Sequence, residues 1–195
     1  RRGLSGKTRW TTYVDGGSLE EVTEYPANYQ QIGTRPNGSR VSRCSLLLQG
    51  DGQCTPKPDS LRAYNPLEDN SIFITGYREQ YGASAAGGAN LLQYFLSGDF
   101  SREQGIYANN ASRRVNLRSN LSAELASNLT GAARFGYGSL RLELPQNDNN
   151  DLSPIANGIF GSAEDDPDLH GYLFYPVEVI NQIYTAQDVD RMTLA

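Results

Sequence analysis

The chain contains one histidine, His170, within Asp168-Leu169-His170-Gly171, so this imidazole is the only one available for general acid–base chemistry. A Ser-His-Asp triad would have to use it, yet no serine lies in the G-x-S-x-G pattern that exposes a nucleophile on a sharp turn. Neither G-x-x-x-x-G-K-S/T nor G-x-G-x-x-G occurs, so no nucleotide cradle is indicated. We therefore expect His170 to be a loop residue and the protein not to be an enzyme.

Two groups of carboxylates supply the oxygen atoms that calcium prefers. The first group is Asp148 with Asp151, and the second is Glu164, Asp165, Asp166 and Asp168. Neither group has the spacing of an EF-hand, and no pair stands out as the acid and nucleophile of a glycosidase. We expect solvated acidic loops that hold no metal and no cofactor.

The two cysteines, Cys44 and Cys54, lie ten residues apart in a stretch that Gly50, Gly52 and Pro56 mark as a loop. A disulfide between them would stabilise the fold by about 2–3 kcal/mol and would require an oxidising compartment such as the periplasm or the cell surface. The spacing excludes a redox C-x-x-C site. We expect the disulfide, and the alternative is two unpaired thiols in a loop.

Composition removes further classes of function. The net charge is −5, and the 17 cationic residues form no basic run, so a nucleic-acid partner is not expected. No stretch approaches the ~20 apolar residues of a membrane-spanning helix. One histidine and two cysteines leave too few ligands for a usual zinc site.

The strongest structural signal is an alternation with period 2 within residues 111–127, sustained for eleven residues, which predicts one long strand with two unlike faces. The apolar face of this strand carries Val115, Leu117, Leu121 and Leu125. The polar face carries Arg114, Asn116, Arg118, Asn120 and Glu124. Globular strands usually have ~5–6 residues, whereas strands of ~9–11 residues with this sidedness suit a transmembrane barrel.

Neighbouring segments behave similarly. Residues 91–100 place Leu92, Tyr94, Leu96 and Phe100 on one face. Residues 7–15, 75–85 and 129–144 are further strands, with tight turns expected at 86–90 and 126–128. Gly136 and Gly138 indicate a bulge or close packing in the last of these strands.

Longer polar connections alternate with the short turns, as in outer-membrane barrels. We expect residues 1–144 to form an antiparallel sheet with a loop at 26–70, and residues 145–195 to form a long polar loop with short helices. One helix is expected from Val177 to Tyr184 behind Pro176, and a second through Met192. The expected fold class is mainly β: an antiparallel sheet of long strands derived from a transmembrane barrel, with short C-terminal helices.

Several motifs, in this order and spacing, resemble the SusC/RagA-type TonB-linked outer-membrane transporters. The N-terminal segment from Arg1-Arg2-Gly3 to Tyr13 resembles the junction between the plug domain and the barrel. The barrel-like motifs are Asn65-Pro66-Leu67-Glu68-Asp69, Thr75-Gly76-Tyr77, Tyr81-Gly82-Ala83-Ser84-Ala85-Ala86-Gly87-Gly88, Tyr94-Phe95-Leu96-Ser97-Gly98-Asp99-Phe100, Glu103-Gln104-Gly105-Ile106-Tyr107 and Arg113-Arg114-Val115-Asn116-Leu117-Arg118-Ser119-Asn120-Leu121.

This resemblance implies import of glycans, peptides or other large nutrients across the outer membrane, energised through TonB and often assisted by a surface lipoprotein. The apolar residues named above would face lipid or a partner, and the polar ones would line the lumen. The chain has about five or six expected strands, fewer than the ~8 of the smallest single-chain barrels, so the remainder of a barrel would have to complete it.

Two alternatives remain open. In the first, the same sheet belongs to a non-enzymatic structural or interaction subunit on the periplasmic side of a membrane-protein complex, and protein covers its apolar face. In the second, the chain is a secreted carbohydrate-binding β-sandwich. The acidic loops and the 12 tyrosines permit it, although no residue pair requires it.

Overall fold

A computed structural model describes residues 6–89, 91–147 and 150–195. It is mainly β, with 57% of residues in strands and 10% in helices, which confirms the expected fold class at that level. Residues 1–5, which carry the start of the expected plug–barrel junction, lie outside the described residues. The chain forms two compact units, described separately below.

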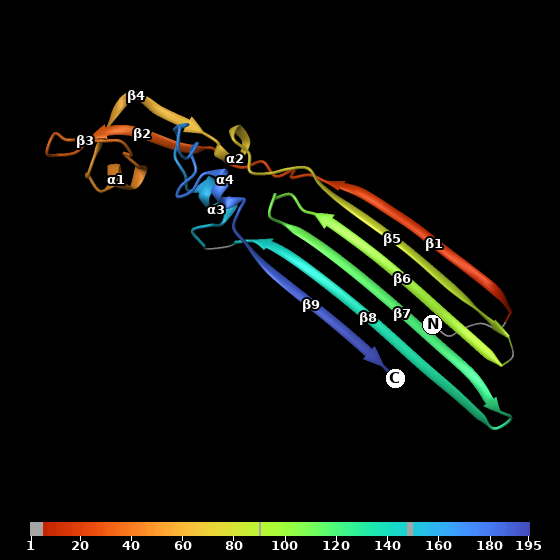
Figure 1. The fold of residues 1–195 in the computed structure, drawn as a ribbon. Coiled ribbons are helices and arrows are strands. Elements are labelled where there is room, and N and C mark those ends of the chain that lie inside the picture. Colours follow the sequence, from red (N-terminus) through yellow and green to blue (C-terminus); the bar gives the residue numbers. More distant parts are fainter. Residues whose placement is uncertain (1–5, 90, 148–149) are drawn as a thin grey trace. The chain divides into compact units, whose positions relative to one another are not determined.

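The first unit, the sheet unit, is a six-stranded antiparallel sheet (Figure 1). Its strand order is β1-β5-β6-β7-β8-β9. The strands are β1 (Gly6–Leu19), β5 (Gly76–Ala89), β6 (Leu92–Gln104), β7 (Ala111–Ala126), β8 (Leu129–Pro145) and β9 (Tyr184–Leu194). They are about twice as long as typical globular strands. The alternation over 111–127 thus marks a real strand, β7, almost residue for residue.

The two short turns join neighbouring strands at one end of the sheet. Ala126 pairs with Leu129, so the turn expected at 126–128 is confirmed. The turn expected at 86–90 comes later, because β5 continues to Ala89, which pairs with Leu92. Asn90 itself lies outside the described residues.

No bulge lies at the two glycines singled out in β8, and close packing is present at Gly138 but not at Gly136, where a side chain would make only an ordinary contact with Thr193. Pairing with β7 runs without a shift through Gly136 and Gly138, and the irregularity falls between Glu124 and Ala126. A side chain at Gly138 would meet the Asn116 Oδ1 atom at 3.3 Å.

The prediction of a second helix through Met192 is wrong, because this segment forms strand β9 beside β8. Arg134 and Ala195 exchange two backbone hydrogen bonds of 2.7 and 3.0 Å. The unpaired edge of β8 supplies hydrogen-bond partners that outweigh the weak local helical preference. The helix expected behind Pro176 is present but short, as α4 (Val177–Ile180).

The three longer connections leave the sheet at the end opposite to the short turns. Leu19 pairs with Gly76, Tyr77 with Gln104, and Ala111 with both Gln104 and Glu143, so these strand ends lie in neighbouring rows. The connections from β1 to β5 and from β8 to β9 supply the second unit, which spans Glu21–Phe73 and Pro145–Ile183.

This second unit, the insertion unit, contains a small sheet in the order β3-β2-β4 and four short helices. The expected loop at 26–70 therefore has regular structure. Its strands are β2 (Asn28–Thr34), β3 (Arg40–Val41) and β4 (Thr55–Tyr64). Its helices are α1 (Leu46–Gly50), α2 (Pro66–Asp69), α3 (Pro154–Ile159) and α4. In the described part of the chain, no helix has the length and apolar character needed to cross a membrane.

A buried core joins the two segments of the insertion unit. Tyr172, Ile72 and Ile180 are each 1% exposed. The Tyr172 hydroxyl donates to the carbonyls of Pro66 and Asn70 at 3.3 and 3.0 Å. These contacts span about a hundred residues of sequence, so long-range packing holds the unit together.

The expected disulfide between Cys44 and Cys54 is present, with the Cα atoms 5.9 Å apart. Both cysteines are buried with Val41, and Leu48 packs against them. Helix α1 lies inside the disulfide loop, and the Ser45 hydroxyl caps it by accepting from the Leu48 N–H.

Candidate functional site

The strand register divides the side chains of the sheet unit between two faces, since directly paired residues point to the same side. Leu92 pairs with Ala123, Tyr94 with Leu121, and Phe100 with Val115. Leu96 pairs with Ser119 in the same row as Trp10 and Phe135. The apolar face, as we name it, consists of Trp10, Val14, Tyr81, Ala85, Leu92, Tyr94, Leu96, Phe100, Val115, Leu117, Leu121, Leu125, Phe135 and Tyr137.

All eight apolar residues singled out in the sequence gather on this face. Leu125 joins them beyond the register shift, because its side chain lies beside Gly131, the partner of Ala123. The leucines of the group stay open to solvent: Leu92, Leu96, Leu117, Leu121 and Leu125 are 43 to 66% exposed. Leucines in the core of a β-sandwich would be buried. This face therefore needs an apolar environment that the described part of the chain does not supply.

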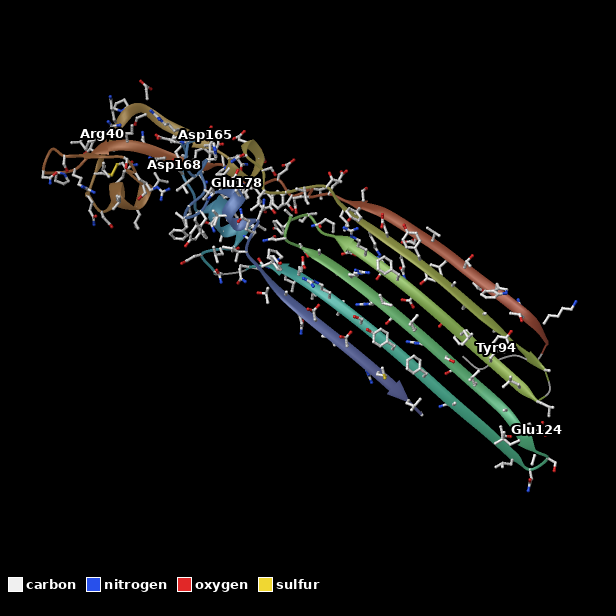
Figure 2. The ribbon with its side chains drawn as sticks, in the orientation of Figure 1. Arg40, Tyr94, Glu124, Asp165, Asp168 and Glu178 are labelled. Atoms are coloured by element: carbon white, nitrogen blue, oxygen red, sulfur yellow. A yellow bond between two sulfur atoms is a disulfide. The ribbon has the colours of Figure 1, made fainter. Side chains whose placement is uncertain are left out.

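The height of the apolar face suits a bilayer. Val115 and Leu125 are ten residues apart on β7, which is about 33 Å along the strand and about 23 Å across a membrane at a ~45° tilt. Tyr81 stacks with Phe100 toward the long connections, with the two ring centroids 6.5 Å apart. Tyr94 and Glu124 lie near the short turns (Figure 2).

The opposite face, the polar face, carries all five polar residues from the sequence, namely Arg114, Asn116, Arg118, Asn120 and Glu124. Asn116 pairs with Asp99, and its side-chain amide donates to the Asp99 carboxylate at 2.7 Å. Glu124 pairs with Thr130 at the end of the sheet, and its backbone N–H donates to the Leu91 carbonyl.

A hollow of about 500 Å³ lies on the polar face. Its polar-face lining comprises Thr11, Tyr13, Ser84, Phe95, Ser97, Asp99, Arg118 and Asn120. The Tyr13 ring lies over Gly82, where any side chain would collide with it, and its hydroxyl accepts from Gln80 at 3.1 Å. The aromatic rings, hydroxyls and amides can bind a polar ligand without covalent chemistry.

Sequence reasoning missed the contributions of Tyr13 and Phe95 to this hollow. Phe95 gave one signal, as an aromatic residue on the otherwise polar side of its strand. Tyr13 gave none, because only the successive pairing of β1 with β5, β5 with β6 and β6 with β7 brings it toward Asp99 and Arg118.

The acidic loop of the insertion unit has a structural role. The Asp166 carboxylate accepts hydrogen bonds from the backbone N–H groups of Asp168, Leu169 and Gly171. Partial burial raises the pKa of Asp166, but these bonds outweigh it and leave the pKa below its usual value. The His170 Nδ1 atom lies 3.0 Å from the Asp165 carboxylate.

No group of three or more His, Cys, Asp or Glu side chains is placed to hold a metal ion within residues 6–89, 91–147 and 150–195. Asp148, which belongs to the first acidic group, lies outside the described residues. The carboxylates of Asp165 and Asp166 instead bind His170 and the loop backbone, respectively.

The sheet has two edge strands, β1 and β9. Every residue of β9 is exposed, as is every residue of β1 except Leu19. Long exposed edges present unpaired backbone groups and template pairing with further strands.

Comparison with protein-family models and with curated proteins gives no match to this chain. The sheet unit itself offers three features that bear on function: an exposed apolar face, a polar face with a hollow, and two open edges.

Proposed function

We propose that this chain forms part of the wall of a TonB-dependent outer-membrane transporter that imports glycans, peptides or other large nutrients. The observation that carries the proposal is the sidedness of the sheet: one face is apolar and uncovered over a bilayer-sized height, and the other is polar. The apolar face contacts lipid, and the polar face lines the lumen.

The connections give the orientation in the membrane. Outer-membrane barrels have short periplasmic turns and long extracellular loops. In this proposal the short turns at Ser127-Asn128 and beside Leu91 face the periplasm, and the long connections leave the sheet on the cell-surface side. The Cys44–Cys54 disulfide agrees with this, because such bonds persist outside the reducing cytosol.

The open edges of β1 and β9 imply that further strands close the wall. An open edge cannot stay unpaired in lipid, because no water is available to its backbone groups. Six strands are also fewer than the ~8 of the smallest such barrels.

Transport in this proposal needs no covalent step. Nutrient binds to the polar face and to the loops, and movement of a plug driven through TonB opens the lumen. The hollow beside Tyr13 and Phe95 offers hydrogen-bonding groups and aromatic surface to a ligand or to the plug. The plug, TonB and a surface lipoprotein enter through the family resemblance alone.

A second candidate is a non-enzymatic subunit on the periplasmic side of a membrane complex, and the same exposed apolar face supports it. In that case protein, rather than lipid, covers Leu96, Leu117 and Leu121.

The single tryptophan makes the proposal testable, because Trp10 lies on the apolar face and is 73% exposed. The full-length protein with its barrel closed, and with Trp10 as its one tryptophan, would be reconstituted in vesicles with and without dibrominated phosphatidylcholine. We expect brominated lipid to quench the Trp10 emission strongly. The matched control is Trp10→Phe combined with Thr11→Trp, which moves the indole to the polar face and should remove most of the quenching.

Equal quenching at both positions, or none at either, would contradict the proposal. A thiol-labelling arm identifies the second candidate, since both cysteines are held in the disulfide. Protection of Leu117→Cys from a water-soluble maleimide in the native assembly, together with unquenched Trp10, would mean that protein covers the face.

A further inference from the structure

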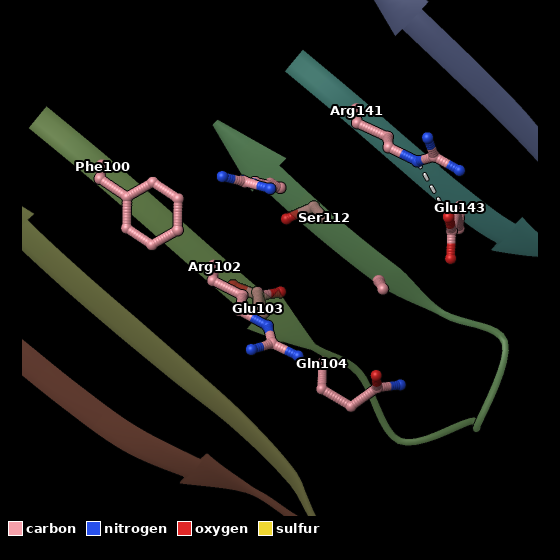
Figure 3. A pocket seen from close by; sticks show the side chains of 9 residues that line it. Phe100, Arg102, Glu103, Gln104, Ser112, Arg141 and Glu143 are labelled. Carbon is pink, nitrogen blue, oxygen red and sulfur yellow. Dashed lines mark hydrogen bonds and ion pairs between the residues drawn. The ribbon is translucent and has the colours of Figure 1, made fainter. Parts of the chain in front are cut away.

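Three arginines lie side by side where the apolar face ends toward the long connections. Arg102 on β6 pairs with Arg113 on β7, which pairs with Arg141 on β8, so all three side chains point to the same side. Figure 3 labels Arg102 and Arg141 among the residues that line the hollow there. All three are exposed, and they line a hollow of about 490 Å³. Phe100 lines it as well, which joins the hollow to the apolar face.

Like charges at directly opposed positions of a sheet repel one another and destabilise it. The carboxylates nearby offset this only in part. The Glu143 Oε1 atom lies 3.1 Å from the Arg141 Nε atom. Glu79 pairs in register with Arg102, and Glu103 lines the hollow. Asp188 on β9 also acts electrostatically on Arg141.

Arg102 and Arg113 form no ion pair with a carboxylate in the described part of the chain. The Arg102 guanidinium lies instead over the Tyr77 ring, 5.5 Å from its centroid. The Arg113 guanidinium lies over the Phe100 ring, 5.4 Å from its centroid. Stacking holds both groups in place while leaving their N–H donors available. A guanidinium fork matches the oxygen atoms of a phosphate and binds them in pairs.

The apolar face continues from this row toward the short turns. Leu96 lies six residues before Arg102 on β6, which is about 20 Å along the strand. There a second hollow of about 360 Å³ is lined by Trp10, Leu96, Leu117 and Phe135 around small residues. The sheet therefore presents cationic groups and then an apolar hollow on one surface, which fits a charged head followed by an acyl chain.

We propose that Arg102, Arg113 and Arg141 bind the phosphate of an anionic lipid in the leaflet at the end of the sheet from which the long connections leave. Its acyl chain packs along Phe100 toward the hollow beside Leu96 and Leu117. This inference rests on the proposed function, because it requires the apolar face to contact lipid.

The test measures lipid binding by the full chain in a neutral detergent, using calorimetry. The probe is dihexanoyl-phosphatidylglycerol, compared with dihexanoyl-phosphatidylcholine and with inorganic phosphate. We expect phosphatidylglycerol to bind at least tenfold more tightly than either. Each arginine near the surface of an anionic membrane typically raises the binding affinity about fivefold. The double variant Arg102→Gln with Arg113→Gln should therefore bind phosphatidylglycerol about 25-fold more weakly.

The matched control is Arg114→Gln, because Arg114 is the next residue of β7 and points to the opposite face. It should change the affinity by less than about twofold, as its charge is remote from the site. The variant Arg102→Lys with Arg113→Lys keeps the charge but loses the planar fork, so we expect a partial loss. This variant also serves as the test if the glutamine variant does not fold.

Equal affinity for the two lipids would overturn the inference, as would an equal loss in Arg114→Gln. Inorganic phosphate binding as tightly as phosphatidylglycerol would overturn it too, because the site would then be one for a free anion. Trp10 quenching separates the two proposals. Quenched Trp10 without a preference for anionic lipid removes this inference alone, whereas unquenched Trp10 removes the proposed function and this inference with it.

Discussion

The two units of this chain obtain their stability in different ways. The insertion unit encloses a core with Tyr172 and Ile180 almost fully buried, and it carries the disulfide. The sheet unit has longer strands and a continuous hydrogen-bonded ladder, yet leaves residues such as Leu117 and Leu121 nearly half exposed. The insertion unit thus buries large side chains in a core of its own, whereas the sheet unit leaves the leucines of its apolar face exposed.

The largest effect is expected from removing the most buried aromatic residue of the insertion unit. Tyr172→Ala should destabilise that unit by about 3–5 kcal/mol, because it leaves a cavity and deletes two hydrogen bonds. Hydrogen exchange of the Leu173 amide, which donates to the Asn157 carbonyl, would report the loss.

The counterpart Leu117→Ala on the sheet unit should lower the free energy of unfolding by less than about 1 kcal/mol in detergent, since that side chain is already half exposed. Equal losses would erase the distinction between the units.

A charge placed on either face of the sheet unit sharpens the comparison further. Leu117→Arg should disfavour membrane insertion by about 2–4 kcal/mol, as cations on a lipid-facing strand do near the midplane. Asn116→Arg, one residue earlier on β7, should have little effect. The measurement is the fraction of chain that co-floats with vesicles across a urea series. Similar behaviour of the two variants would mean that the faces do not differ in their contact with lipid.

The smallest effect concerns the acidic loop of the insertion unit. The folded-state pKa of Asp166 is below the ordinary 3.8, so its stabilising effect is complete above that value and is lost as the pH falls through the lowered pKa. Asp166→Ala should cost about 1 kcal/mol at pH 6 and progressively less in strong acid. The check is the urea midpoint of unfolding of the unsubstituted protein and of Asp166→Ala, measured from pH 6 to pH 2. We expect the difference between the two midpoints to shrink as the pH falls. A difference that stays constant with pH would contradict a role for the carboxylate charge.

Local pattern was sufficient to find β5 to β8 and the division of Leu117 and Asn116 between faces, because period-2 alternation is written into each strand. It failed for β9, whose strand conformation depends on the edge of β8. The core around Tyr172 was equally hidden, since its partner Pro66 lies 106 residues away.

The sequence also did not reveal which residues lie in the same row across neighbouring strands. Arg102, Arg113 and Arg141 are spread over 40 residues, and only the register places them together. The hollow near Tyr13 arises in the same way. Binding groups on a sheet are assembled by pairing, so reading single strands does not find them.

The insertion unit is interrupted in the chain by β5, β6, β7 and β8. During synthesis Cys44 and Cys54 emerge early and close together, whereas Tyr172 follows only after all four strands have been made. The unit therefore cannot finish folding until all four of these strands have been synthesised. A conformation-specific antibody against the folded unit would accordingly recognise only chains in which β5 to β8 have already been made.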